Sequence, residues 1–234
     1  MTERQIELTE NFKRVRERIA EAALRRGGGE VTLLGATKTV PAEDIVFAAE
    51  NLGLTAAGEN KPQEFAEKYD AVSPLLDFQF IGRLQRNKAH LVVGRASLIH
   101  SVDSVRLAKQ IDLSASRLGI VQDVLLEVNI GREESKTGFL PEETAEAEAM
   151  IAALPSVRVR GIMTMAPACD KKDELRKYFE ETYSIFIDIF QKKSHNIREY
   201  ILSMGMSDSF VEAIEEGATL VRIGSALFGR RSYQ

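Results

Sequence analysis

The chain has little cysteine and lacks any long hydrophobic run. Its 234 residues contain one cysteine, Cys169, which excludes an internal disulfide framework and is typical of a reducing compartment. No stretch approaches the ~20 apolar residues of a membrane span, and residues 1–7 lack the apolar core of a secretory signal. These absences predict a cytoplasmic globular protein that does not act at a membrane.

The chain also lacks an excess of basic residues and any metal-ligand spacing. Its formal net charge of −4 argues against a general nucleic-acid binder, which would normally carry a basic face. No spacing of His, Cys, Asp and Glu typical of a metal site occurs. The glycine triplet at 27–29 precedes the first predicted strand, so it indicates a helix end and not a dinucleotide-binding loop.

What is present is a regular alternation of strand and helix patterns. An amphipathic helix is predicted near residues 3–25, and further helical patterns lie near 42–51, 61–69, 87–93, 103–118, 141–153, 171–192 and 208–216. Short apolar runs between them predict eight strands: Val31–Thr37, Leu54–Gly58, Leu76–Ile81, Leu98–Ser101, Val124–Asn129, Val157–Met163, Tyr200–Ser203 and Leu220–Ile223.

Such alternation implies right-handed βαβ units and a parallel sheet. Because the strand count reaches eight, it favours a single (β/α)8 TIM barrel over residues 1–234, with an extra N-terminal helix. A doubly wound open sheet is the alternative architecture. No linker or low-complexity tract divides the chain into further domains.

Lys38 stands at the carboxyl end of the first predicted strand, where α/β proteins collect their ligands. An amine in this place can be pushed by burial toward its nucleophilic form, ready to make a Schiff base with an aldehyde. An isolated lysine is more often a strand-end residue that reaches solvent. The choice between the two therefore depends on what lies across the rim.

A phosphate-binding pattern follows the last two predicted strands, where many barrels hold a phosphate. Ser203 through Asp208 and Arg222 through Ala226 combine small hydroxyl residues with glycine, which lets backbone amides approach an anion. The alternative for Ser207 and Asp208 is a simple cap of the next helix. A lysine facing a phosphate site is what an aldehyde bearing a phosphate ester needs, and pyridoxal 5′-phosphate (PLP) is such a molecule.

With these motifs the sequence resembles the pyridoxal phosphate homeostasis protein family, which is similar to the N-terminal barrel of bacterial alanine racemases. The resemblance runs essentially end to end. Its most specific stretches are Leu202–Asp208 and Gly217–Ser225; others are Gly35–Val40, Gly58–Asn60, Phe80–Lys88, Ser101–Asp103, Ser135–Gly138 and Gly161–Met165.

The resemblance implies that Lys38 carries PLP as a Schiff base and that Asn60 lies close to the ring. It implies a phosphate held by Ser203, Ser207, Gly224 and Ser225, with Arg222 beside either the ring nitrogen or the phosphate. Met163, on the same rim, is also expected to bind the cofactor. No residue is assigned a catalytic role, and no metal is expected.

Several residues are left open. Family members often carry Trp-His before Phe-Ile-Gly, and this chain has Phe78-Gln79, so the role of that histidine is in doubt here. Lys136 is a solvated charge or a second amine near the aldehyde. His100 at a strand end faces the site or packs in the core, and His90 and His195 are predicted at the surface.

The resemblance favours a non-catalytic carrier that takes part in intracellular PLP homeostasis and passes PLP to apo-enzymes. Alanine racemases need a C-terminal domain that supplies a catalytic tyrosine across a dimer, and this chain ends at Gln234 soon after its eighth strand, which favours a monomer without that base. Tyr233 has no matching motif. The alternatives are a PLP-dependent amino-acid enzyme of the alanine racemase type and a Schiff-base aldolase without PLP.

Overall fold

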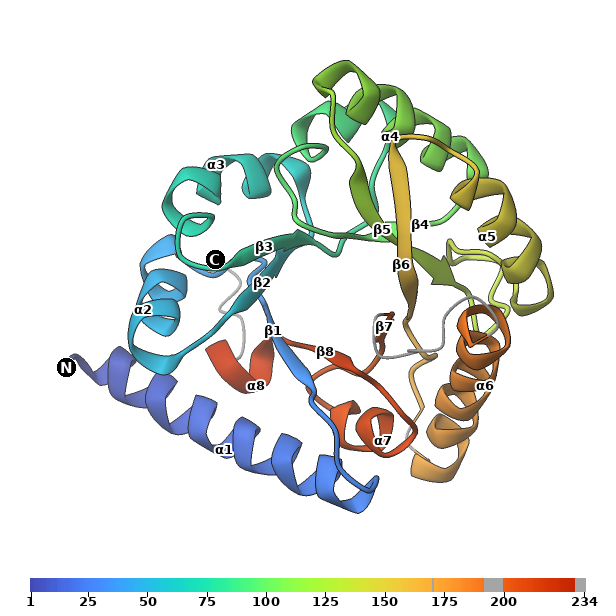
Figure 1. Cartoon of the computed structure of the whole chain (residues 1–234). Helices are drawn as coiled ribbons and strands as arrows, with labels where there is room; N and C mark the ends of the chain where they lie inside the picture. Colours follow the sequence, from blue (N-terminus) through green and yellow to red (C-terminus); the bar gives the residue numbers. More distant parts are fainter. Residues whose placement is uncertain (170, 192–199, 230–234) are drawn as a thin grey trace.

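Eight parallel strands form a closed barrel in the computed structural model, which describes residues 1–169, 171–191 and 200–229. The strands pair in chain order, and β8 pairs with β1 to close the sheet (Figure 1). Their bounds are β1 Thr32–Ala36, β2 Ala56–Glu59, β3 Asp77–Phe80, β4 Ile99–Val102, β5 Gln122–Val128, β6 Val157–Thr164, β7 Ile201–Ser203 and β8 Leu220–Ile223. The predicted barrel is confirmed, and the open sheet is excluded.

Helices surround the barrel, and an additional N-terminal helix precedes the first strand (Figure 1). The α-helices are α1 Glu3–Arg25, α2 Ala42–Leu52, α3 Pro62–Val72, α4 Val105–Leu118, α5 Thr144–Ala152, α6 Lys172–Phe190, α7 Phe210–Glu215 and α8 Ser225–Phe228. Two 3₁₀ helices, η1 Arg86–Leu91 and η2 Pro141–Glu143, stand where the sequence predicts ordinary helix. The short α8 is not predicted.

Thr2 caps the first helix. Its hydroxyl accepts a hydrogen bond from the amide of Gln5, and the side-chain oxygen of Gln5 accepts one from the amide of Thr2. The helix ends before the glycine triplet, whose three residues all have positive φ. It packs against α7 and α8, so the first helix of the chain lies against the last two. Within the described residues, no helix is long and apolar enough to cross a membrane.

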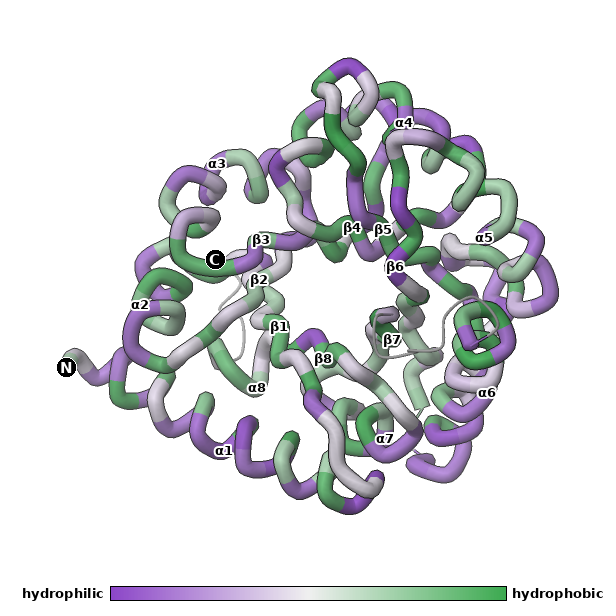
Figure 2. The backbone as a smooth tube through the Cα atoms, viewed as in Figure 1, coloured by the Kyte–Doolittle hydropathy of each residue, from purple (hydrophilic) through white to green (hydrophobic). Residues whose placement is uncertain are grey.

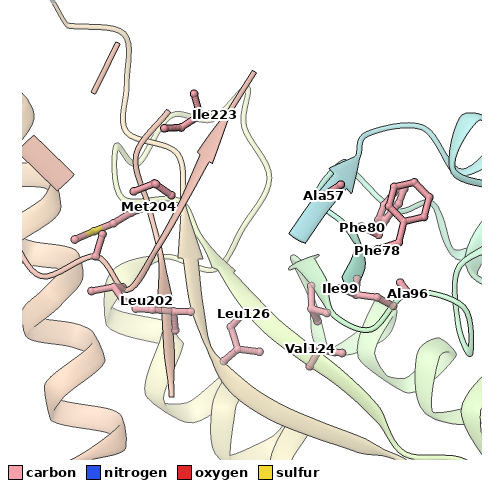
Figure 3. Close-up of a cluster of buried hydrophobic side chains, with 14 of the residues drawn as sticks. Ala57, Phe78, Phe80, Ala96, Ile99, Val124, Leu126, Leu202, Met204 and Ile223 are labelled. Carbon is pink, nitrogen blue, oxygen red and sulfur yellow. The ribbon is translucent and has the colours of Figure 1, made fainter. Parts of the chain in front are cut away.

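The hydrophobic core lies between the strands and the surrounding helices, and Figure 3 shows part of it. Phe78 on β3 stacks on Phe65 of α3 with ring centroids 4.4 Å apart, and Phe80 meets the same ring edge-on at 6.1 Å. In Figure 2 the helices alternate between hydrophobic and hydrophilic residues, as expected for helices with one face on a sheet. This packing makes the barrel a rigid support for its loops.

The barrel interior is filled by two small apolar clusters and a set of buried polar side chains. The first cluster contains Leu34, Ala56, Ile81 and Leu220, and the second contains Leu98, Leu125 and Met163. The buried polar residues on the strands include Gln79, His100, Glu127, Ser203 and Arg222. Because burying polar groups costs free energy unless they are hydrogen-bonded, this polar set requires a specific network.

Candidate ligand site at the carboxyl ends of the strands

Lys38 lies two residues beyond β1, in a turn, and is half-buried. It lines a cavity of about 330 Å³ together with Gly224 and Ser225, which directly follow β8. Strands β1 and β8 are neighbours, so closing the barrel brings the first and last strand ends to one cavity. The predicted amine and part of the predicted phosphate loop therefore lie together.

The loop after β7 joins the same region through Ser207. The Oγ atom of Ser207 accepts hydrogen bonds from the amides of Gly224 and Ala226, both at 3.3 Å. Gly224 lies close to β1, since a Cβ added to it would stand 3.3 Å from the carbonyl oxygen of Ala36. Ser207 does not cap α7, whose N-cap residue is Ser209. The hydroxyl of Ser207 thus marks a pair of convergent backbone amides next to β1.

Arg222 lies deeper, inside the barrel, and is 4% exposed. Its Nη1 donates to the carbonyl oxygen of Ser203 at 2.9 Å and to the Ser203 hydroxyl at 2.6 Å, and its Nη2 donates to the carbonyl oxygen of Thr164 at 2.9 Å. Burial lowers the pKa of Arg222 to about 10, and the nearby charge of Glu127 opposes this shift. The guanidinium therefore remains a cation at neutral pH.

Comparisons with known proteins identify the family of this chain. The model of the alanine racemase N-terminal domain matches residues 7–232. A protein of Aquifex aeolicus, named pyridoxal phosphate homeostasis protein, is 46% identical over 227 residues, which is 96% of this chain and 98% of the relative. The chain belongs to the pyridoxal phosphate homeostasis protein family.

Two solved structures have folds similar to that of this chain. PipY of Synechococcus elongatus, solved with PLP bound, is 29% identical with a TM-score of 0.78, and the match covers 95% of this chain and all of PipY. An alanine racemase of Clostridium difficile is 17% identical with a TM-score of 0.73, and the match covers 96% of this chain and 60% of the racemase. The second likeness shows the shared barrel fold alone.

In this chain an imidazole reaches the barrel interior from β4, while β3 carries Gln79. His100 of β4 is fully buried, with Nδ1 3.1 Å from the Ser203 hydroxyl and Nε2 2.7 Å from Oε1 of Gln79. Strands β4 and β7 are not sheet neighbours, so this chain of contacts crosses the interior.

The chemistry of the donors and acceptors determines which group donates in each of these hydrogen bonds. Oε1 of Gln79 can only accept, so Nε2 of His100 is the donor, and Nδ1 of the neutral ring accepts from the Ser203 hydroxyl, whose oxygen in turn accepts from Arg222. Gln79 thus holds His100 in one neutral tautomer. Burial, together with the charge of Arg222, keeps the pKa of His100 well below its usual value of 6.5.

This shift predicts a pH dependence of stability. Below a pH of about 6.5, His100 binds a proton in the unfolded chain but stays neutral in the folded chain. The folded state therefore loses stability as the pH falls below that value. The loss approaches roughly 1.4 kcal/mol per pH unit. His100→Gln keeps an acceptor and a donor but does not titrate, so its melting temperature should fall less between pH 7 and pH 5. His90→Gln, at an exposed histidine, is the control; a wild-type slope in His100→Gln would contradict the assignment.

The other predicted residues are distributed around the rim. Asn60 directly follows β2 and is half-buried, whereas Met163 is 1% exposed and packs in the apolar cluster with Leu98 and Leu125. Lys136 lies in the loop after β5 and forms an ion pair with Glu133 at 3.0 Å. His90 is exposed as predicted, and His195 and Tyr233 lie outside the described residues.

Sequence reasoning missed Glu127, a carboxyl group on β5 that is 5% exposed. Its pKa is raised by burial and by Asp103, while Thr137, Arg222 and Arg83 oppose the shift. The signal was available, because Glu127 is the one charged residue in the predicted strand Val124–Asn129.

A larger hollow, of about 680 Å³, opens at the opposite end of the barrel between Tyr183, Tyr200 and Thr219. Among the residues that the structure describes, no lysine lines it, and the amino-terminal face of a (β/α)8 barrel is ordinarily a stability face. The chemistry therefore favours the smaller cavity beside Lys38 as the ligand site.

Proposed function

We propose that this protein binds PLP at the carboxyl ends of its strands, holds it covalently through Lys38, and takes part in PLP homeostasis. The observation that carries the proposal is the cavity that Lys38 shares with Gly224 and Ser225. It pairs an amine for the aldehyde with backbone amides for the phosphate. Membership of the homeostasis family, and the PLP bound in PipY, support the same function.

The donor set suits the two ends of the ligand. We assign the phosphate to the amides around Gly224 and Ser225 and to the Ser207 hydroxyl, because these groups already converge. Asn60, at the end of β2, is proposed to lie beside the ring, since β2 is the neighbour of β1. Met163 lies in the apolar cluster below, so any contact with the ring would come from under the site.

We propose that Arg222 serves the ring and not the phosphate. A strand rises about 3.3 Å per residue, so Arg222 lies roughly 7 Å deeper along β8 than Gly224. Two of its nitrogen atoms are held by Ser203 and Thr164, which fixes the guanidinium in place. In this assignment Ser203 acts through Arg222, and its direct contact with phosphate stays a prediction.

Bound PLP supplies an electrophilic aldehyde and a ring that withdraws electrons most strongly when its nitrogen is protonated. Arg222 is a donor without a lone pair, so beside the ring nitrogen it disfavours protonation there. A carrier needs the first property and not the second. This electrostatic argument, with the family's name, supports a non-catalytic role over an enzyme of the alanine racemase type.

We further propose that residues 1–234 form a single PLP-binding domain, which the match over residues 7–232 supports. The proposal includes a monomer in the cytoplasm that passes PLP to apo-enzymes. A Schiff-base aldolase without PLP is the third class of function, after the carrier and the PLP-dependent enzyme. It predicts a colourless protein that forms an imine with a sugar phosphate instead.

The purified protein is expected to bind PLP reversibly and to restore activity to a PLP-dependent apo-enzyme, without turning over amino acids itself. The test is a screen of common amino acids for deuterium uptake at Cα, run beside the transfer assay. Turnover of roughly 1 s⁻¹ or more, abolished by Lys38→Ala, would show that the protein is an enzyme. Failure to transfer PLP would remove the carrier role.

A further inference from the structure

The turn that contains Lys38 is strained and is held from one side. Thr39 has a φ of 65°, in the left-handed region that a β-branched residue rarely adopts. Such strain persists only where the surroundings impose it. The amide of this strained residue is held from α3, where Oε1 of Glu64 accepts its hydrogen bond at 2.7 Å.

Glu64 belongs to a cluster centred on Lys68, four residues further along α3. The Nζ atom of Lys68 lies 2.8 Å from Oε1 of Glu64, 2.6 Å from Oε1 of Glu59 and 2.9 Å from the carbonyl oxygen of Thr37. An ammonium group has three donors, and all three are used. Lys68 is 12% exposed and Glu59 is fully buried, so the cluster is largely shielded from water.

The cluster therefore forms hydrogen bonds with both sequence neighbours of Lys38, Thr37 and Thr39. Thr37 is held by its carbonyl oxygen and by its hydroxyl, which lies 3.0 Å from Glu59, while Thr39 is held by its amide. The same Glu59 accepts from the amide of Asn60 at 3.1 Å. One ammonium and two carboxylates thus tie the ends of β1 and β2 to α3.

The charges of Lys68, Glu59 and Glu64, which we call the clamp, are consistent with a structural role. Burial raises the pKa of Glu59, although its hydrogen bond with Lys68 opposes that shift. Burial also acts to raise the pKa of Glu64, but hydrogen bonds from Lys68 and from the Thr39 amide outweigh it and leave the pKa lowered. Lys68 therefore favours the ionised form of both carboxylates.

We propose that Lys68, Glu59 and Glu64 are positioning residues that hold the Lys38 turn so that its amine reaches the aldehyde of bound PLP. The inference rests on the proposed function. None of the three has to touch the ligand. Their effect is on the geometry of attack, where a misplacement of about 1 Å can cost a hundredfold in rate.

The experiment separates attachment from binding. Glu64→Ala removes the acceptor of the Thr39 amide, and Lys68→Met with Glu59→Gln removes the ammonium without leaving a buried charge. The rate of covalent attachment is followed by visible absorption after mixing with PLP. Non-covalent affinity is measured by calorimetry with pyridoxine 5′-phosphate, which has an alcohol in place of the aldehyde. The control is Arg176→Met, which removes a cation that binds the carboxylates of Glu215, the last residue of α7, and of Glu216, which follows it.

Attachment should slow by roughly tenfold to a hundredfold in both clamp variants, with the affinity for pyridoxine 5′-phosphate within about twofold of wild type and Arg176→Met unchanged. Attachment at the wild-type rate, or an equal loss of attachment and affinity, would overturn the inference. If wild-type Lys38 itself takes no PLP, the proposed function fails, and the inference fails with it.

Discussion

Lys38→Ala is expected to abolish covalent attachment of PLP while leaving the barrel folded. The amine is the only group of residue 38 that can bond to the aldehyde, and the residue lies in a turn outside the strands. Its replacement should lower the melting temperature by no more than about 2–4 °C, the change that corresponds to roughly 1 kcal/mol. Borohydride reduction followed by peptide mass spectrometry measures the attachment directly.

Lys61→Ala is a matched control, because Lys61 follows Asn60 on the same rim and is exposed. The wild type and Lys61→Ala should carry the reduced pyridoxyl group on the peptide that contains residue 38. Predominant label on another lysine, such as Lys136, would move the attachment site. Label that persists at wild-type levels in Lys38→Ala would have the same consequence.

The barrel could be predicted from the sequence because its strands are short apolar runs between helical patterns. Every predicted strand overlaps an observed one, and β8 matches at both ends. The exceptions are local. The residues near 87–93 form a 3₁₀ helix in place of an α-helix, and α8 spans only four residues, too few for a periodic pattern.

Part of the site was also predictable, because barrel closure makes the first and last strands neighbours. That topology alone places Lys38 near Gly224. The contact of His100 with Gln79 and Ser203 was not predictable, since it depends on which side chains point inward across the barrel. The contacts of Lys68 could not be predicted for a similar reason. A lysine on an amphipathic helix ordinarily faces solvent, and only the folded structure shows its three acceptors.

Arg222→Met is expected to lower both the stability of the ligand-free protein and its retention of PLP. The sequence alone predicts mainly an effect on the ligand. The structure adds a folding effect, because Arg222 makes three hydrogen bonds in the interior and the acceptors on Ser203 and Thr164 would lose them. Loss of these bonds should cost on the order of 3 kcal/mol, or roughly 6–12 °C in melting temperature.

The role of Arg222 at the ring can be separated from this folding effect by a second variant and a control. Arg222→Lys keeps a cation but cannot make the forked contact, so it should recover part of the stability without restoring PLP retention. Arg83→Met removes an exposed cation that also acts on Glu127, and its stability should stay within about 0.5 kcal/mol of wild type. Thermal denaturation without ligand, with PLP titration of each variant, gives both quantities. If Arg222→Met melts with the wild type, the network through Ser203 does not stabilise the barrel; if it also retains PLP normally, the ring-side role of Arg222 is wrong.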